Sequence, residues 1–119
     1  MDFNKSGIAL IVGGSSGMDK AVANNMRTLN GGNIVNIGSM WSKQAVKATA
    51  SSAYSMTKAG LHALTKYMAM ELSEYNIRVN AVSPTVVKTP IYNSFINENE
   101  VDEALDRFND FHPFGRIGT

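Results

Sequence analysis

The sequence has no cysteine, and only three prolines, two histidines and one tryptophan among its 119 residues. The absence of cysteine excludes disulfides, thiolate zinc sites and cysteine nucleophiles. A metal centre would therefore depend on carboxylates, and no group of Asp, Glu and His residues has the spacing of metal ligands. We expect no metal site, and we expect a cytoplasmic location, because a reducing compartment does not harm a chain without thiols.

Strong charge of one sign is also missing, since 11 Lys and Arg residues stand against 10 Asp and Glu residues and no basic run occurs. This balance provides neither the field of a duplex-binding protein nor a polybasic membrane patch. The longest apolar stretch, residues 7–14, is too short for a membrane span and lacks the flanks of an export signal. The composition predicts a globular protein that binds neither nucleic acid nor membrane.

Three short apolar segments have the pattern of buried strands. Ile8–Val12 is an unbroken apolar run before a cluster of glycines, which indicates a strand covered on both faces. Residues 33–38 and Ile77–Val82 predict two further strands, the last of them ended by a proline. The other predicted elements are helices over residues 19–29, 51–74 and 97–111 and a loop over residues 39–49. This alternation predicts an α/β fold, namely part of a Rossmann-like, doubly wound parallel sheet in a single domain over residues 1–119.

The helix predicted over residues 51–74 carries two apolar stripes when its residues are placed at 100° intervals. The first stripe consists of Leu61, Leu64, Met68 and Leu72. The second lies nearly opposite and consists of Met56, Ala59, Ala63, Tyr67 and Met70. Because a helix on a sheet needs only one apolar face, the second stripe predicts a partner helix and a homodimer or homotetramer.

A glycine-rich turn follows the first predicted strand and runs from Gly13 through Ser16 and Gly17 to Met18. A turn of this kind presents backbone N–H groups and the positive end of a helix to a phosphate. It is also a common connection between a strand and a helix, so a phosphate site needs a second signal.

Tyr54 and Lys58 provide that signal, because the i, i+4 spacing places a phenol and an ammonium one turn apart on one helix face. The ammonium stabilises the phenolate form and so favours acid/base chemistry at the tyrosine. The alternative without function is a tyrosine and a lysine that are both solvated on a helix surface. Ser39, which ends the second predicted strand, adds a hydroxyl that is able to bind a substrate carbonyl oxygen.

Four motifs together resemble the short-chain dehydrogenase/reductase family. They are Gly-x-x-x-Gly at residues 13–17, Asn-Ile-Gly-Ser at 36–39, Tyr-x-x-x-Lys-Ala-Gly at 54–60 and Arg-Val-Asn-Ala-Val-Ser-Pro at 78–84. The resemblance implies an NAD(P)-dependent oxidoreductase that moves a hydride between a nicotinamide and a small-molecule carbonyl or secondary alcohol.

The same resemblance assigns roles to individual residues. Tyr54 would be the general acid/base, Lys58 would stabilise its phenolate and hold the nicotinamide ribose, and Ser39 would orient the substrate oxygen. The residues implied in binding NAD or NADP are Gly13, Ser16, Gly17, Met18, Tyr54, Lys58, Val87 and Thr89.

The chain also departs from the family pattern. Asp19 replaces the third glycine of the cofactor turn, where we expect its carboxylate to repel a pyrophosphate and its side chain to obstruct the packing of helix on strand. Residues 19–26 resemble the helix that precedes the serine strand, so the middle of the family's domain is predicted to be absent. In the family the first strand pairs with one of these missing strands, so the three remaining strands need a gap or a rearrangement.

Two explanations stay open at this point: residues of a longer polypeptide that the sequence omits, or an internal deletion. A deletion favours a second function, a non-catalytic remnant that acts through helix-mediated self-association. A third possible function is a phosphate-binding module without redox chemistry, but this function leaves Tyr54 and Lys58 unexplained. His62, on the long predicted helix, is expected to be a partly exposed packing residue. Neither substrate, cofactor preference nor reaction direction follows from the sequence.

Overall fold

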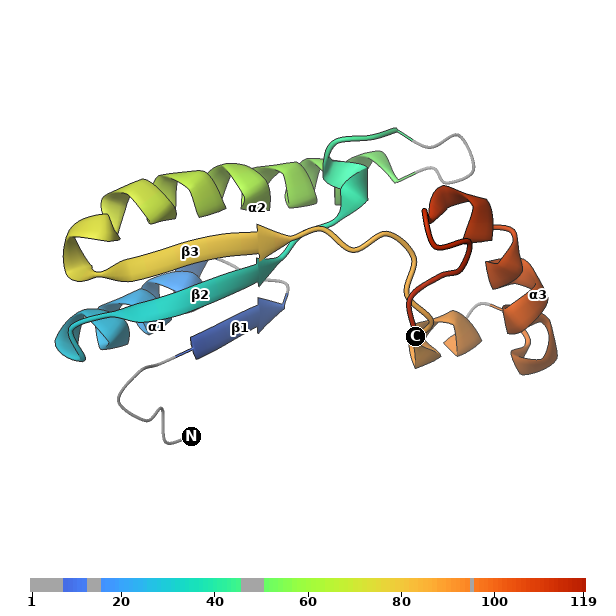
Figure 1. The fold of residues 1–119 in the computed structure, drawn as a ribbon, viewed down its shortest axis with the longest axis horizontal. Coiled ribbons are helices and arrows are strands. Elements are labelled where there is room, and N and C mark those ends of the chain that lie inside the picture. Colours follow the sequence, from blue (N-terminus) through green and yellow to red (C-terminus); the bar gives the residue numbers. More distant parts are fainter. Residues whose placement is uncertain (1–7, 13–15, 46–50, 95) are drawn as a thin grey trace. The chain divides into compact units, whose positions relative to one another are not determined.

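The computed structural model describes residues 8–12, 16–45, 51–94 and 96–119. The chain divides into two compact units, Met1–Ser83 and Pro84–Thr119, and each is described by itself. The first unit contains the parallel sheet and the two long helices (Figure 1). Its main elements are β1 (Ile8–Val12), α1 (Ser16–Thr28), β2 (Gly32–Ile37), α2 (Ser52–Glu71) and β3 (Ile77–Val82).

The sheet has three parallel strands in the order β1-β2-β3. Leu10 of β1 lies opposite Val35 of β2, which in turn lies opposite Asn80 of β3. The predicted α/β fold is therefore confirmed, and β1 pairs directly with the strand that precedes Ser39. The conflict in strand order is resolved by rearrangement, because β1 takes the place beside β2 and leaves no gap.

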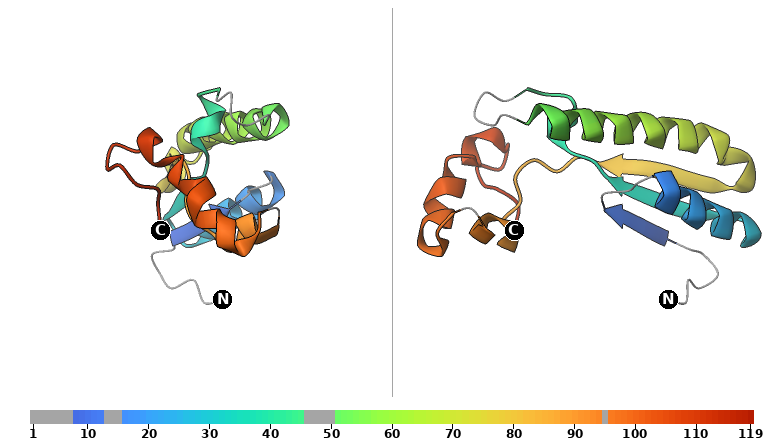
Figure 2. Two further views of the ribbon diagram at one scale, coloured as in Figure 1. Left: turned by 90° about the vertical axis from the view of Figure 1, so that its right-hand side faces the viewer. Right: turned by 180° about the vertical axis from the view of Figure 1, so that it is seen from behind.

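Both helices pack on the same face of the sheet (Figure 2). The core of this unit, among the residues whose burial is described, joins α1, α2, β2 and β3 through Ala23, Met26, Ile34, Met68, Ile77 and Val79. On β3 the buried residues Ile77 and Val79 alternate with the exposed Arg78 and Asn80, as period-two geometry requires. One face of the sheet thus holds the core, and all three carboxyl ends meet at one edge.

The predicted boundaries hold best where apolar periodicity is strong. Ile77–Val82 is a strand over the predicted range, whereas α1 begins at Ser16 and so includes three residues predicted to form the turn. A short 3₁₀ helix, η1 (Met40–Ser42), occurs inside the predicted loop. Asn30 ends the α1 region with a φ of 63°, a left-handed conformation that asparagine tolerates well.

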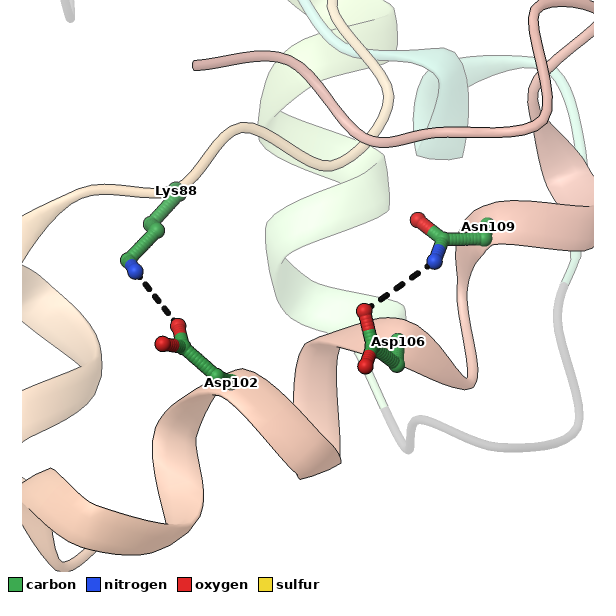
Figure 3. Close-up of polar contacts among 4 residues, drawn as sticks. All are labelled: Lys88, Asp102, Asp106 and Asn109. Carbon is green, nitrogen blue, oxygen red and sulfur yellow. Dashed lines mark hydrogen bonds and ion pairs between the residues drawn. The ribbon is translucent and has the colours of Figure 1, made fainter.

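The acidic helix predicted over residues 97–111 does not form as one continuous helix, so that prediction was wrong. The helical segments found there are η4 (Glu98–Glu100), α3 (Val101–Asp106) and η5 (Asn109–Phe111). Only Val101 and Leu105 of α3 are buried, so the apolar stripe is too short for a long helix. After α3, the Asn109 amide donates to the Asp106 carboxylate at 3.1 Å (Figure 3). The Asn109 side-chain oxygen accepts from the Ile117 backbone N–H.

Backbone pairing joins the two ends of the second unit, and an ion pair links its first segment to α3. Val87 pairs with Gly118 as an isolated parallel bridge, and the Lys88 ammonium binds the Asp102 carboxylate (Figure 3). Among the helices in the described ranges of both units, none is long and apolar enough to cross a membrane.

Candidate active site

Tyr54 and Lys58 lie in the amino-terminal half of α2, and their side chains are in contact distance of a cation–π pair. The Lys58 ammonium lies 5.8 Å from the centre of the Tyr54 ring. It also donates a hydrogen bond to the carbonyl oxygen of Ile37 at 2.7 Å, which anchors it to the carboxyl end of β2. Tyr54 is 49% exposed, so its phenol is accessible to a ligand.

Ser39 lies two residues beyond that carbonyl and is almost fully buried, at 3% exposure. Its Oγ accepts a hydrogen bond from the Trp41 backbone at 3.3 Å and so caps η1. Its carbonyl oxygen accepts from the Ser42 hydroxyl at 2.6 Å. Because η1 packs against α2, the Ser39 bend lies on the same side of the sheet as the Tyr54 and Lys58 helix (Figure 1).

A buried polar link fixes α2 on β2 behind these residues. The Asn36 amide is fully buried and donates to the Thr65 hydroxyl at 2.9 Å, and that hydroxyl donates to the Leu61 carbonyl at 2.8 Å. This bond pairs the amide nitrogen, which would otherwise be unfavourable in the core, while the Asn36 side-chain oxygen has no partner among the described residues. The sequence signal was a polar residue at an inward position of an apolar strand.

His62 makes contacts that the sequence analysis did not predict. It was expected to pack at a partly exposed position, and it is indeed half-buried. Its Nε2 also lies 3.0 Å from the Ser83 hydroxyl, at hydrogen-bonding distance, and its ring lies against Gly38. The signal was the spacing of Lys58, His62 and Thr65, which places all three on the sheet-facing side of α2.

The predicted cofactor turn is described only in part. Gly13 lies outside the described residues, while Ser16, Gly17 and Met18 form the first turn of α1. Backbone N–H groups at that position have no acceptor inside the helix, which suits a phosphate. Val87 and Thr89 belong to the second unit, where Thr89 is exposed. No group of three His, Asp or Glu side chains within the described ranges is arranged to hold a metal.

Asp19 occupies a different environment from the one expected of it. We expected its carboxylate to face the pyrophosphate, but the side chain is only 1% exposed. It lies on the same helical face as Ala23 and Met26, which pack in the core. Within the part of the chain that the structure describes, neither carboxylate oxygen has a hydrogen-bond partner. Desolvation by burial raises the pKa of the Asp19 carboxyl above its ordinary value of 3.8.

Because the pKa of Asp19 is raised in the folded state, we predict that its contribution to the free energy of unfolding decreases as pH rises. Below the unfolded-state pKa, near 3.8, the carboxyl is neutral in both states and has no effect. Above the folded-state pKa the buried carboxylate destabilises the fold. We expect Asp19→Asn to match the wild type in urea unfolding near pH 3 and to exceed it at pH 7, because the amide carries no charge that burial would destabilise.

The exposed Glu74→Gln variant is the control for this pH series, because it removes a carboxylate that is already solvated. Its unfolding free energy should stay close to that of the wild type at both pH values. An Asp19→Asn curve that stays parallel to the wild-type curve from pH 3 to pH 7 would show that Asp19 is not a buried charge.

Comparison with known proteins identifies the family. The family model described as Enoyl-(Acyl carrier protein) reductase matches residues 7–119. L-xylulose reductase of Cavia porcellus is 52% identical over 87 residues, which are 72% of this chain and 33% of that protein. Carbonyl reductase [NADPH] 2 of Sus scrofa is 41% identical over 86 residues, which are 72% of this chain and 34% of that protein. The chain thus spans about a third of the length of these curated relatives.

Solved structures give the same result. ElxO with NADP bound superposes with a TM-score of 0.69 at 30% identity, covering 84% of this chain and 39% of that chain. A gluconate 5-dehydrogenase from Burkholderia cenocepacia, in complex with NADP and tartrate, has a TM-score of 0.67 at 29% identity, covering 83% and 37%. With a family model that matches nearly its whole length and with these relatives, the chain belongs to the short-chain dehydrogenase/reductase family.

Proposed function

We propose that this chain provides the catalytic part of an NAD(P)-dependent oxidoreductase that acts on a small-molecule carbonyl or secondary alcohol. The observation that carries the proposal is the Lys58 ammonium, held on the Ile37 carbonyl and 5.8 Å from the Tyr54 ring, beside the Ser39 bend. These groups gather where ligands bind in open parallel sheets, at the carboxyl ends of the strands. A cytoplasmic location belongs to the same proposal, and fractionation of cells expressing the chain would test it.

Each residue of this site has a distinct task. The exposed Tyr54 hydroxyl gives a proton to a carbonyl oxygen, or takes one from an alcohol in the reverse direction. The Lys58 ammonium stabilises the phenolate, and its two N–H groups not directed at Ile37 are available to ribose hydroxyls. The Ser39 hydroxyl orients the substrate oxygen, and its position is fixed because its Oγ caps η1 through the Trp41 backbone N–H.

Two groups of residues at the carboxyl ends of the strands in the first unit fit a nicotinamide dinucleotide. Lys58 suits the ribose, and the first turn of α1 suits the diphosphate. Ser16, Gly17 and Met18 begin α1 and offer backbone N–H groups to a diphosphate, and the Asp19 carboxylate is buried instead of exposed beside them. When bound, the cofactor supplies or accepts the hydride. Val87 and Thr89 lie in the second unit, and only the resemblance to the family proposes them as cofactor-binding residues.

Titration of the purified chain with NADPH and NADH, monitored by nicotinamide fluorescence, tests this function. We expect saturable binding of at least one of the two, followed by oxidation of the reduced cofactor in the presence of a panel of carbonyl compounds. Binding without turnover would favour a nucleotide-binding module. Absence of both would favour the non-catalytic alternative.

Self-association, which the enzyme and the non-catalytic alternative share, has its own supporting observation. The second stripe of α2 is exposed, with Met56 at 73%, Tyr67 at 62% and Met70 at 65%. The first stripe is turned to the core through Leu61 and Met68. Exposed apolar stripes of this kind mark sites of protein association, so we propose a homodimer or homotetramer joined through α2.

Met70→Lys is expected to weaken self-association at least about tenfold, because an ammonium would be buried in an apolar interface. Analytical ultracentrifugation over a concentration series measures the dissociation constant. Glu71→Lys introduces the same group at the neighbouring exposed position off the stripe and should leave the constant nearly unchanged. Equal effects of the two variants would remove the stripe from the interface.

A further inference from the structure

His62 lies where three segments of the first unit meet. It belongs to α2, its Nε2 is 3.0 Å from the hydroxyl of Ser83 just after β3, and its ring lies against Gly38 just after β2. A Cβ added to Gly38 would collide with the imidazole, 2.9 Å from Cε1, and would lie 3.1 Å from the Val82 carbonyl oxygen. Only glycine therefore fits at position 38 while His62 is present.

The contacts of His62 complete a set of links between α2 and the strand ends. One turn earlier on α2, Lys58 binds the carbonyl oxygen of Ile37, the last residue of β2. The Gly38 N–H donates to the Val82 carbonyl at 2.8 Å, which joins the ends of β2 and β3. His62 adds the connection from α2 to the end of β3, so helix and both strand ends are tied together directly before Ser39.

We infer that His62 is a positioning residue for the proposed reaction. Through Ser83 and the close contact with Gly38, it sets the distance from α2 to the bend that carries Ser39. The proposed role is to hold the bend in place, and no step of the proton transfer is assigned to His62. The inference rests on the proposed function only for its catalytic consequence, since the positioning of the bend is a property of the fold.

Five variants and one control test the inference, and one of the five, His62→Ala, is the reference for the double variant. Gly38→Ala forces a methyl group into the ring, and Gly38→Ala/His62→Ala removes the ring that it strikes. His62→Leu keeps the bulk and removes the hydrogen bond, whereas His62→Gln keeps an amide that is able to reach Ser83. Glu71→Gln changes an exposed residue of the same helix and serves as the control.

Activity and fluorescence are the two readouts. Misplacement of reacting groups by about 1 Å lowers rates by about 100-fold. We therefore expect kcat to fall about 10- to 100-fold in Gly38→Ala and His62→Leu with little change in KM, and to recover largely in His62→Gln. Trp41 is the only tryptophan and lies in η1, next to Ser39, so its emission reports on the bend without any cofactor.

In Gly38→Ala the Trp41 emission is expected to shift, and in the double variant to return to that of His62→Ala alone. Effects of the two substitutions that simply add would overturn the inference, since residues in contact should couple. A His62→Leu variant that lowers the melting temperature but keeps the wild-type kcat and emission would also overturn it. If the wild type has no turnover, the proposed function fails, and the coupling in Trp41 emission alone decides whether His62 positions the bend.

Discussion

Replacing Tyr54 by phenylalanine is expected to lower kcat for carbonyl reduction by about 100- to 10,000-fold, the range over which a general acid contributes. The ring and its contact with the Lys58 ammonium are retained, so only the proton donor is lost. We therefore expect the dissociation constant for NADPH to change little. Steady-state kinetics and a fluorescence titration of the same preparation measure the two quantities.

Tyr67→Phe is the matched control for this experiment. Tyr67 lies on the same helix, is 62% exposed, and loses the same hydroxyl. Its kcat should stay within about twofold of the wild type, because the substitution removes only a hydroxyl and leaves the apolar ring of the second stripe in place. A Tyr54→Phe variant with wild-type kcat would show that the phenol does not handle the proton, whatever the fold.

The elements of the first unit could be predicted because their signals are local. Ile77–Val82 has an apolar pattern and a following proline, and the structure has a strand over the same residues. The pairing of β1 with β2 could not be predicted in this way, because it is a contact between segments distant in the sequence and no local pattern determines it. Sequence alone showed that the expected order was impossible but not how the chain would resolve it.

The site was predictable to the same extent. Tyr54 and Lys58 are four residues apart on one helix, so their pairing follows from helix geometry alone. His62 and Ser83 are 21 residues apart on different elements, and their contact depends on how α2 lies on β3. The burial of Asp19 was missed for another reason, since carboxylates are nearly always solvated and nothing in its neighbourhood indicated the contrary.

Lys58→Met is expected to affect binding and chemistry together, unlike Tyr54→Phe. The ammonium is held on the Ile37 carbonyl at 2.7 Å and offers its other N–H groups to the ribose. Hydrogen bonds from a charged group contribute about 1.5–3 kcal/mol, which corresponds to about 10- to 150-fold weaker NADPH binding. Loss of the charge beside Tyr54 should lower kcat as well, by about 100-fold or more.

Lys66→Met removes an exposed ammonium two turns further along α2 and is the control for charge and helix content. It should bind NADPH and turn over like the wild type. If Lys58→Met bound NADPH normally but lost kcat, Lys58 would act on Tyr54 alone and the ribose contact would be excluded. If it lost binding and kept kcat at saturating cofactor, the ammonium would hold the cofactor without assisting the phenol, and proton transfer would depend on Tyr54 and Ser39 only.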